Sequence, residues 1–184
     1  MLDKNSRLIV LDRDGVINED LWGYVTKRKE FSPVDGSLEA IAKLTGAGFQ
    51  IAIATNQACI NKGIITQKVL EKIHDHMSNL IEEAGGKINY IAVCPHLPKE
   101  GCSCRKPEIG LLKLIEKERG ASFVGSFFIG DKESDILCAT RYGCIPLLVK
   151  TGYGSQTFLS PENCPPKEQC FNDLFCAVDY VLKA

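Results

Sequence analysis

Two carboxylates stand two residues apart at the end of a short apolar run: Asp12 and Asp14, within the sequence DRDG. Side chains at positions i and i+2 of an extended segment point the same way, so both carboxylates would face the same space. Like charges this close need a cation or a shared proton. The pair therefore indicates a metal or acid–base site, although Asp and Gly are also common in the turns that follow strands.

Two more polar segments follow apolar runs. Thr55 follows QIAIA and offers a hydroxyl, and Asp131 follows SFFIG in the sequence GDKESD. Asp12, Asp131 and an oxygen near Asp14 would make a hard-oxygen site suited to Mg²⁺, which binds carboxylates, waters and phosphate. Lys106 would add a positive charge, so the four segments together predict a phosphate site.

The segment 94–108, CPHLPKEGCSCRKPE, holds four metal-ligand side chains: Cys94, His96, Cys102 and Cys104. Three sulfurs and one imidazole match a closed structural zinc site. A redox pair would need Cys-x-x-Cys, and a disulfide would leave one cysteine over and give His96 no role. The loop 94–107 is therefore predicted to bind Zn²⁺, which would fix the path of the next two residues, Arg105 and Lys106.

The elements that must position these side chains alternate along the chain. Short apolar runs predict buried strands at 7–11, 50–54, 88–93, 126–129 and 145–149. Helical periodicity predicts helices at 37–47, after Thr66, and at 109–119, 134–142 and 171–182. Strand and helix in alternation predict an α/β fold, a three-layer Rossmann-like parallel sheet whose ligands bind beyond the carboxyl ends of the strands.

We assign no role in this site to two further segments. His74 and His76 lie two apart on a predicted helix and so do not share a face, and we expect both at the surface. The stretch 153–170 is rich in Pro and Ser, and we expect a surface excursion there.

The composition limits the function classes. A chain of 184 residues suits one domain, 1–184, and a net charge of −1 gives no basic field for nucleic acid or anionic lipid. The N-terminal apolar run is too short for a signal peptide or a membrane span. We therefore expect a cytoplasmic protein, working as a monomer on a small molecule.

The four segments, in this order and after successive strands, resemble the four motifs of the haloacid dehalogenase superfamily of phosphatases. That resemblance implies that Asp12 is the nucleophile and Asp14 the general acid and base. It implies that Thr55 and Lys106 hold the phosphoryl oxygens, and that Asp12, the backbone carbonyl of Asp14, and Asp131 bind Mg²⁺. The intervals between the motifs leave no room for an inserted domain, so we expect a capless enzyme.

The zinc loop, spelled CPH…CSCRKP, is similar to one branch of that superfamily, which holds heptose bisphosphate phosphatases and histidinol-phosphate phosphatases. Gly23-Tyr24-Val25, the GDK form of the last motif, and Lys150-Thr151-Gly152 favour the heptose enzymes. The chain differs from them at Ala58-Cys59 and Asn61-Lys62. By this resemblance, the residues that contact the substrate are Asp20, Trp22, Gly23, Tyr24, Asn56, Gln57, Arg105 and Lys132, with Arg105 at the distal phosphate.

The expected activity is Mg²⁺-dependent hydrolysis of the 7-phosphate of D-glycero-D-manno-heptose 1,7-bisphosphate through an aspartyl-phosphate. The reaction would serve the synthesis of nucleotide-activated heptose for lipopolysaccharide core or surface glycan. Histidinol-phosphate hydrolysis is the enzymatic alternative. A zinc-stabilised binding module, in which the carboxylates are only turn and cap residues, is the non-catalytic one.

Overall fold

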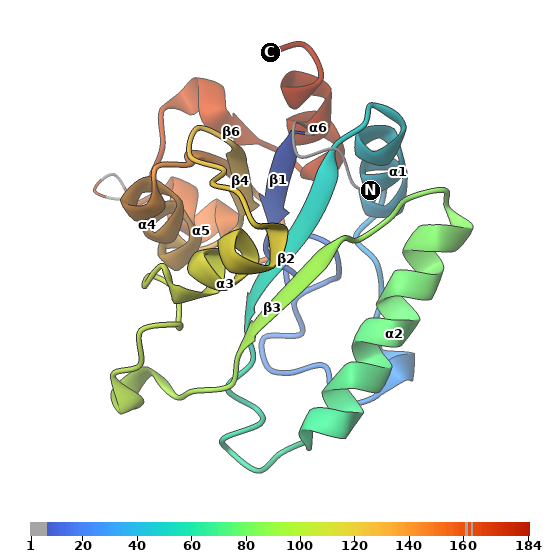
Figure 1. Cartoon of the computed structure of the whole chain (residues 1–184), viewed down its shortest axis with the longest axis vertical. Helices are drawn as coiled ribbons and strands as arrows, with labels where there is room; N and C mark the ends of the chain where they lie inside the picture. The colour runs from blue at the N-terminus through green and yellow to red at the C-terminus, as the bar shows by residue number, and fades with distance from the viewer. Residues whose placement is uncertain (1–6, 161, 163) are drawn as a thin grey trace.

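The computed structural model of the chain describes residues 7–160, 162 and 164–184, and its centre is a six-stranded parallel sheet (Figure 1). The strand order is β3-β2-β1-β4-β5-β6. The strands are β1 Leu8–Leu11, β2 Gln50–Asn56, β3 Tyr90–Cys94, β4 Phe127–Gly130, β5 Ile145–Val149 and β6 Cys170–Phe171. The order reverses direction at β1, and β1 and β4 therefore lie side by side where ligands bind in such sheets.

Both faces of the sheet are covered, which explains why its strands are mostly apolar on both faces. All four residues of β1 are buried, and side chains from alternate positions enter two different cores. On one face they pack against α1 Ser37–Gly46, α2 Gln67–Glu83 and α6 Leu174–Val181. On the other face they pack against α3 Gly110–Arg119 and α4 Glu133–Tyr142 (Figure 1). The predicted three-layer α/β parallel sheet is confirmed.

Local sequence signals set several element ends close to where they were expected. Thr66 caps α2, and its hydroxyl accepts a hydrogen bond from the backbone N–H of Val69. Asp135 accepts one from the backbone N–H of Lys132 at the start of α4. Gly120 and Gly143 end α3 and α4 in the left-handed conformation that glycine adopts at low cost.

The stretch 153–170 lies mostly at the surface, as expected, but it contains short regular elements at its two ends. It begins with α5 Gly154–Phe158 and ends with η3 Lys167–Gln169 and the first residue of β6. Its elements are only two to five residues long, too short for a hydrophobic period to show in the sequence. The backbone N–H of Lys150 donates to the carbonyl of Phe171 and adds this segment to the sheet edge.

Within the described residues, neither of the two intervals that could hold an inserted domain contains one. Between Asp14 and α1 there is a loop with η1 Arg28–Glu30, and between β2 and β3 there is only α2. No helix in the described part of the chain has the length and apolar character that crossing a bilayer requires. The expected domain 1–184 also includes positions 1–6, 161 and 163, which lie outside the described residues.

Candidate functional site

A cavity of about 1040 Å³ opens at the carboxyl ends of the strands, where the polar segments were expected to meet. It is lined by eleven of the twelve residues predicted to act in catalysis or substrate binding: Asp12, Asp14, Asp20, Trp22, Gly23, Tyr24, Thr55, Asn56, Arg105, Lys106 and Lys132. These residues come from β1 and the loop after it, from β2, from the segment before α3, and from the start of α4. The parallel arrangement thus brings together side chains that are far apart in the sequence.

A buried lysine lies between two buried carboxylates at the floor of this cavity. Nζ of Lys106 is 2.8 Å from Oδ1 of Asp12 and 2.6 Å from Oδ1 of Asp135. Burial and the nearby Asp135 raise the pKa of Asp12, although Lys106 acts in the opposite direction. The two carboxylates outweigh burial at Lys106 and raise its pKa, so the lysine stays charged.

The backbone of neighbouring loops packs closely around the carboxylate of Asp131. Its Oδ2 accepts a hydrogen bond from the backbone N–H of Tyr153 at 2.8 Å, and a Cβ on Gly15 or Gly152 would collide with its carboxylate. Among the described residues, Oδ1 of Asp131 has no hydrogen-bond partner although it is buried. Burial raises the pKa of Asp131 well above its ordinary value.

Asp12, Asp131 and Asp135 offer three carboxylate oxygens that lie within 4.8 Å of one another. All three are buried, and buried carboxylates this close repel one another unless a cation neutralises them. An all-oxygen set with one unpartnered oxygen fits Mg²⁺. Asp135 also contacts Lys106. In the sequence, only its position in GDKESD indicates that it belongs to this site.

The carboxylate of Asp14 is held by donors on three sides. Arg13 donates from Nη2 at 2.6 and 2.8 Å, and Asn18 and Gln57 donate from their amides at 3.0 and 2.8 Å. Burial alone would raise the pKa of Asp14, but the Arg13 charge and these hydrogen bonds outweigh it and lower that pKa. Asp14 is therefore ionised in this arrangement.

The expectation that His74 lies at the surface was wrong. His74 is 8% exposed, and its Nε2 lies 3.1 Å from Nη1 of Arg13, whose side chain is fully buried. Two histidines two apart on a helix do point in different directions, and here one of these directions is inward. Nothing in the local sequence shows that a buried arginine lies opposite.

Asn56 and Gln57 follow Thr55 but face different ways. The amide of Asn56 donates to the carbonyl of Lys106 and accepts from its backbone N–H, both at 3.1 Å, so it fixes the backbone that carries the lysine. Gln57 is the one predicted binding residue that is not on the cavity lining. Its amide is buried and donates to Asp14 and to Oγ1 of Thr55.

One wall of the cavity joins the loop after β1 to α4 and α5. Nζ of Lys132 is 2.9 Å from Oδ2 of Asp20, and the rings of Trp22 and Tyr153 meet edge to face with centroids 4.5 Å apart. Tyr153 was not predicted, because it directly follows the Lys150-Thr151-Gly152 segment, at the start of a stretch assigned to the surface. Lys62, one of the positions at which the sequence departs from the pattern that it resembles, has its Nζ 5.2 Å from the centroid of the Tyr24 ring.

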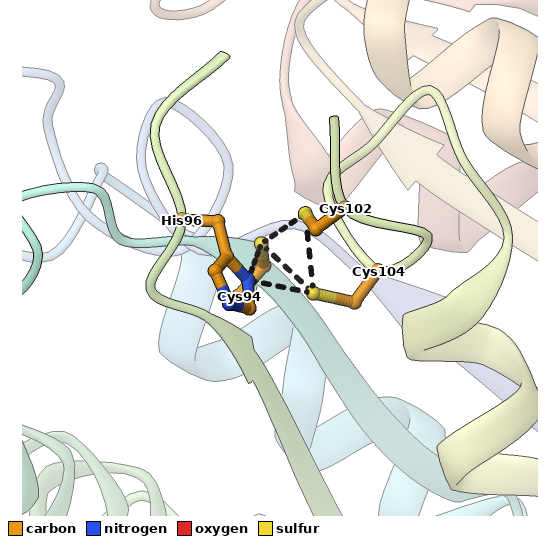
Figure 2. A group of neighbouring side chains, drawn as sticks. All are labelled: Cys94, His96, Cys102 and Cys104. Atoms are coloured by element: carbon orange, nitrogen blue, oxygen red, sulfur yellow. Dashed lines mark hydrogen bonds between the residues drawn. The ribbon is translucent and has the colours of Figure 1, made fainter. Parts of the chain in front are cut away.

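The four predicted zinc ligands converge between β3 and α3 (Figure 2). The three sulfurs are 3.1 to 3.7 Å apart, and Nδ1 of His96 lies 3.2 Å from Sγ of Cys104 and 3.6 Å from Sγ of Cys94. In a tetrahedron with Zn–S bonds of about 2.3 Å, the sulfurs would be about 3.8 Å apart. The cluster therefore has the composition and nearly the dimensions of a structural zinc site.

This Cys/His cluster is tied directly to the residue that follows it. The backbone N–H of Arg105 donates to Sγ of Cys102, and Nη1 of Arg105 donates to the carbonyl of His96 at 3.0 Å. Burial opposes ionisation of Cys102, but the backbone donors of Arg105 and Cys104 outweigh it and lower its pKa to about 7. Burial raises the pKa of Cys94 and of Cys104, so these two thiols would lose their protons only as a metal binds.

Comparisons with known proteins give a consistent result. A family model described as HAD-hydrolase-like matches residues 103–175. The D-glycero-beta-D-manno-heptose-1,7-bisphosphate 7-phosphatase of Pseudomonas aeruginosa is 41% identical over 176 residues, which are 96% of this chain and 98% of the relative. The enzyme of the same name from Bordetella bronchiseptica is 37% identical over 96% of this chain and 98% of the relative.

A solved structure agrees with these relatives. The crystal structure of D,D-heptose 1,7-bisphosphate phosphatase from B. bronchiseptica, complexed with magnesium and phosphate, superposes with a TM-score of 0.90 at 37% identity. The match covers 96% of this chain and 98% of that one. Fold and sequence therefore point to the same family over nearly the whole chain.

Proposed function

Because this chain belongs to the haloacid dehalogenase superfamily, within its family of D-glycero-D-manno-heptose-1,7-bisphosphate 7-phosphatases, we propose that it hydrolyses the 7-phosphate of such a heptose bisphosphate. As a member of that family of phosphatases it is a phosphoric monoester hydrolase. The observation that carries the proposal is the arrangement of charges at the floor of the cavity. Lys106 lies between the carboxylates of Asp12 and Asp135, and an oxygen of Asp131 lies within 4.8 Å of an oxygen of each of these two. A phosphate entering there would meet one nucleophile and one fixed cation.

In this proposal Asp12 attacks phosphorus and forms an aspartyl-phosphate, which splits one difficult displacement into two steps. Asp12 directly follows β1, and its Oδ1 also accepts a hydrogen bond from the backbone N–H of Arg13 at 2.7 Å, which fixes the carboxylate's orientation. Lys106 and the Thr55 hydroxyl hold the phosphoryl oxygens as charge moves across them. Both side chains are nearly fully buried, so they are positioned before the substrate arrives.

Asp14 transfers protons in both steps. It protonates the sugar oxygen as that oxygen leaves, and then takes a proton from the water that hydrolyses the aspartyl-phosphate. It lines the cavity while Arg13, Asn18 and Gln57 hold it from behind. The lowered pKa of Asp14 favours the ionised form, which the second step needs, whereas the first step starts from the protonated form.

Asp12, the backbone carbonyl of Asp14, and Asp131 would hold Mg²⁺, with Asp135 orienting Lys106 beside them. The ion would supply positive charge that offsets the repulsion between the Asp12 carboxylate and a phosphate. The Cys94, His96, Cys102 and Cys104 cluster would hold Zn²⁺ in a purely structural role. Its position directly before Arg105 and Lys106 suits a loop that presents both cations to the substrate.

The remaining cavity residues would recognise the sugar and its second phosphate. Arg105 would bind the distal phosphate, because a guanidinium can make two parallel hydrogen bonds to it. Asp20, Trp22, Gly23 and Tyr24 form one wall, with Lys132 held by Asp20. Asn56 and Gln57 would act mostly through Lys106 and Asp14, since their amides are already bonded there.

We further propose that the protein is cytoplasmic and works as a single-domain monomer. Its product would be used in the synthesis of nucleotide-activated heptose. The test of substrate is the release of phosphate from the α and β anomers of the heptose bisphosphate and from histidinol phosphate, compared by kcat/KM. Preference for either heptose anomer supports the proposal. Preference for histidinol phosphate would contradict it, and absence of Mg²⁺-dependent turnover with any phosphate ester would favour a binding module.

A further inference from the structure

The side chain of Arg13, the second residue of DRDG, is fully buried, so its guanidinium must find hydrogen-bond acceptors within the protein. A guanidinium is always charged in proteins and can only donate hydrogen bonds. Nε and Nη2 donate to the oxygens of Asp14 at 2.6 to 3.1 Å. The group at the other edge, 3.1 Å from Nη1, is Nε2 of His74.

This contact fixes the chemical state of His74. Since Arg13 cannot accept, Nε2 must be the acceptor, and the ring is neutral with its proton on Nδ1. Burial and the Arg13 charge both disfavour the imidazolium and lower the pKa of His74 to about 3. His74 lies in the middle of α2, so a helix that contributes no residue to the cavity lining still reaches the reactive end of β1.

We infer that His74 is a positioning residue for Asp14, which acts through Arg13; this inference rests on the acid–base role proposed for Asp14. A guanidinium is a rigid planar fork. Holding Nη1 therefore sets the plane in which Nε and Nη2 meet the carboxylate. Asn18 and Gln57 also hold Asp14, but each is uncharged and makes a single contact to it.

The test uses leaving groups that differ in their need for a proton. A sugar alkoxide must be protonated as it leaves, whereas p-nitrophenolate leaves without help. The parameter kcat/KM reports only the steps up to release of the alcohol, so it isolates this difference. We compare His74→Leu, which removes the acceptor, with His74→Gln, whose amide oxygen replaces it.

We expect His74→Leu to lose about 10- to 100-fold in kcat/KM on the heptose bisphosphate, as a misplaced catalytic group does. On p-nitrophenyl phosphate the loss should stay within about threefold, because no proton is needed there. His74→Gln should recover most of the difference. His76→Leu, two residues away and outside the contact, is the matched control and should resemble the wild type on both substrates.

Equal losses on both substrates, or no loss on either, would overturn the inference. If His74→Leu fails to fold, Arg13→Lys tests the same point, because it keeps the buried charge but loses the fork; it should show the same dependence on leaving group. If the wild type leaves heptose bisphosphate intact, the substrate proposal fails on its own. The comparison then uses another alkyl phosphate that the enzyme hydrolyses, such as glycerol 3-phosphate, and complete inactivity overturns both.

Discussion

Nζ of Lys106 lies 2.8 Å from Oδ1 of Asp12, and both side chains are buried at the floor of the cavity. This contact joins the end of β1 to the end of the loop that carries the Cys/His cluster. The same ammonium contacts Asp135 at the start of α4, so one lysine links three segments of the site. Positioning of this lysine therefore underlies the effects expected for changes at Lys106, Asn56 and Cys102.

Replacing Lys106 by Met should lower kcat by about 10²- to 10³-fold, as loss of one fixed donor to a developing negative charge does. The measurement is steady-state phosphate release at saturating Mg²⁺. Lys99→Met, an exposed lysine of the same loop, is the control and should be unaffected. Activity of the Lys106 variant within threefold of the wild type would show that this cation does not act on the phosphoryl group.

Asn56→Ala should weaken the site without removing any charge. The variant loses both hydrogen bonds to the Lys106 backbone, which costs about 1–3 kcal/mol in stability. We expect kcat to fall by about 10-fold through misplacement of the ammonium. Asn61→Ala removes an exposed contact to Glu100 and serves as the control; an equal effect there would contradict the account.

Cys102→Ser should release zinc and raise KM by about 10-fold or more, because Arg105 and Lys106 lose the loop that positions them. Stability should fall as well. Metal content by mass spectrometry and thermal unfolding accompany the kinetics. Cys176→Ser, at an exposed cysteine outside the cluster, is the control, and unchanged kinetics in a zinc-free Cys102 variant would refute the coupling.

Stabilisation by Mg²⁺ should grow as the pH rises above the ordinary carboxylate pKa of about 4. Burial raises the pKa of Asp12 and of Asp131, so the metal-free folded state binds more protons than the unfolded one above the ordinary carboxylate pKa of about 4. The contribution of these two carboxyl groups to the stability of the metal-free chain therefore falls as the pH rises. Mg²⁺ binds the ionised form and offsets that loss only where the protons have left.

Thermal unfolding with and without Mg²⁺ at a series of pH values measures this effect. The increase in Tm on adding Mg²⁺ should be small at low pH and larger at high pH, and Asp131→Asn should reduce it throughout. An increase that is the same at every pH, or larger at low pH, would contradict the proposed ligands.

The sheet and the meeting of the motifs could be predicted because both depend on strong local signals. Fully apolar runs such as residues 8–11 fit only a sheet covered on both faces, and parallel strands bring their carboxyl ends to one edge. The Cys/His cluster was predictable because three cysteines and one histidine within eleven positions rarely occur for a reason other than metal binding. Family resemblance added the roles of single residues, which spacing alone does not provide.

The parts that could not be predicted depend on contacts across long sequence distances. His74 was assigned to the surface because helical spacing says which residues share a face, but not which buried charge lies opposite. The inward direction of Gln57 and the place of Tyr153 depend on how loops pack against Asp14 and Asp131. The short elements α5 and β6 have too few residues for a periodic pattern.

The most direct test of the central claim follows the two phosphates of D-glycero-D-manno-heptose 1,7-bisphosphate separately by ³¹P NMR in the presence of Mg²⁺ and enzyme. We predict that the 7-phosphate resonance disappears as inorganic phosphate appears, while the 1-phosphate resonance remains. With the Asp12→Asn variant, both resonances should stay unchanged. Loss of the 1-phosphate, or hydrolysis that persists in Asp12→Asn, would contradict it.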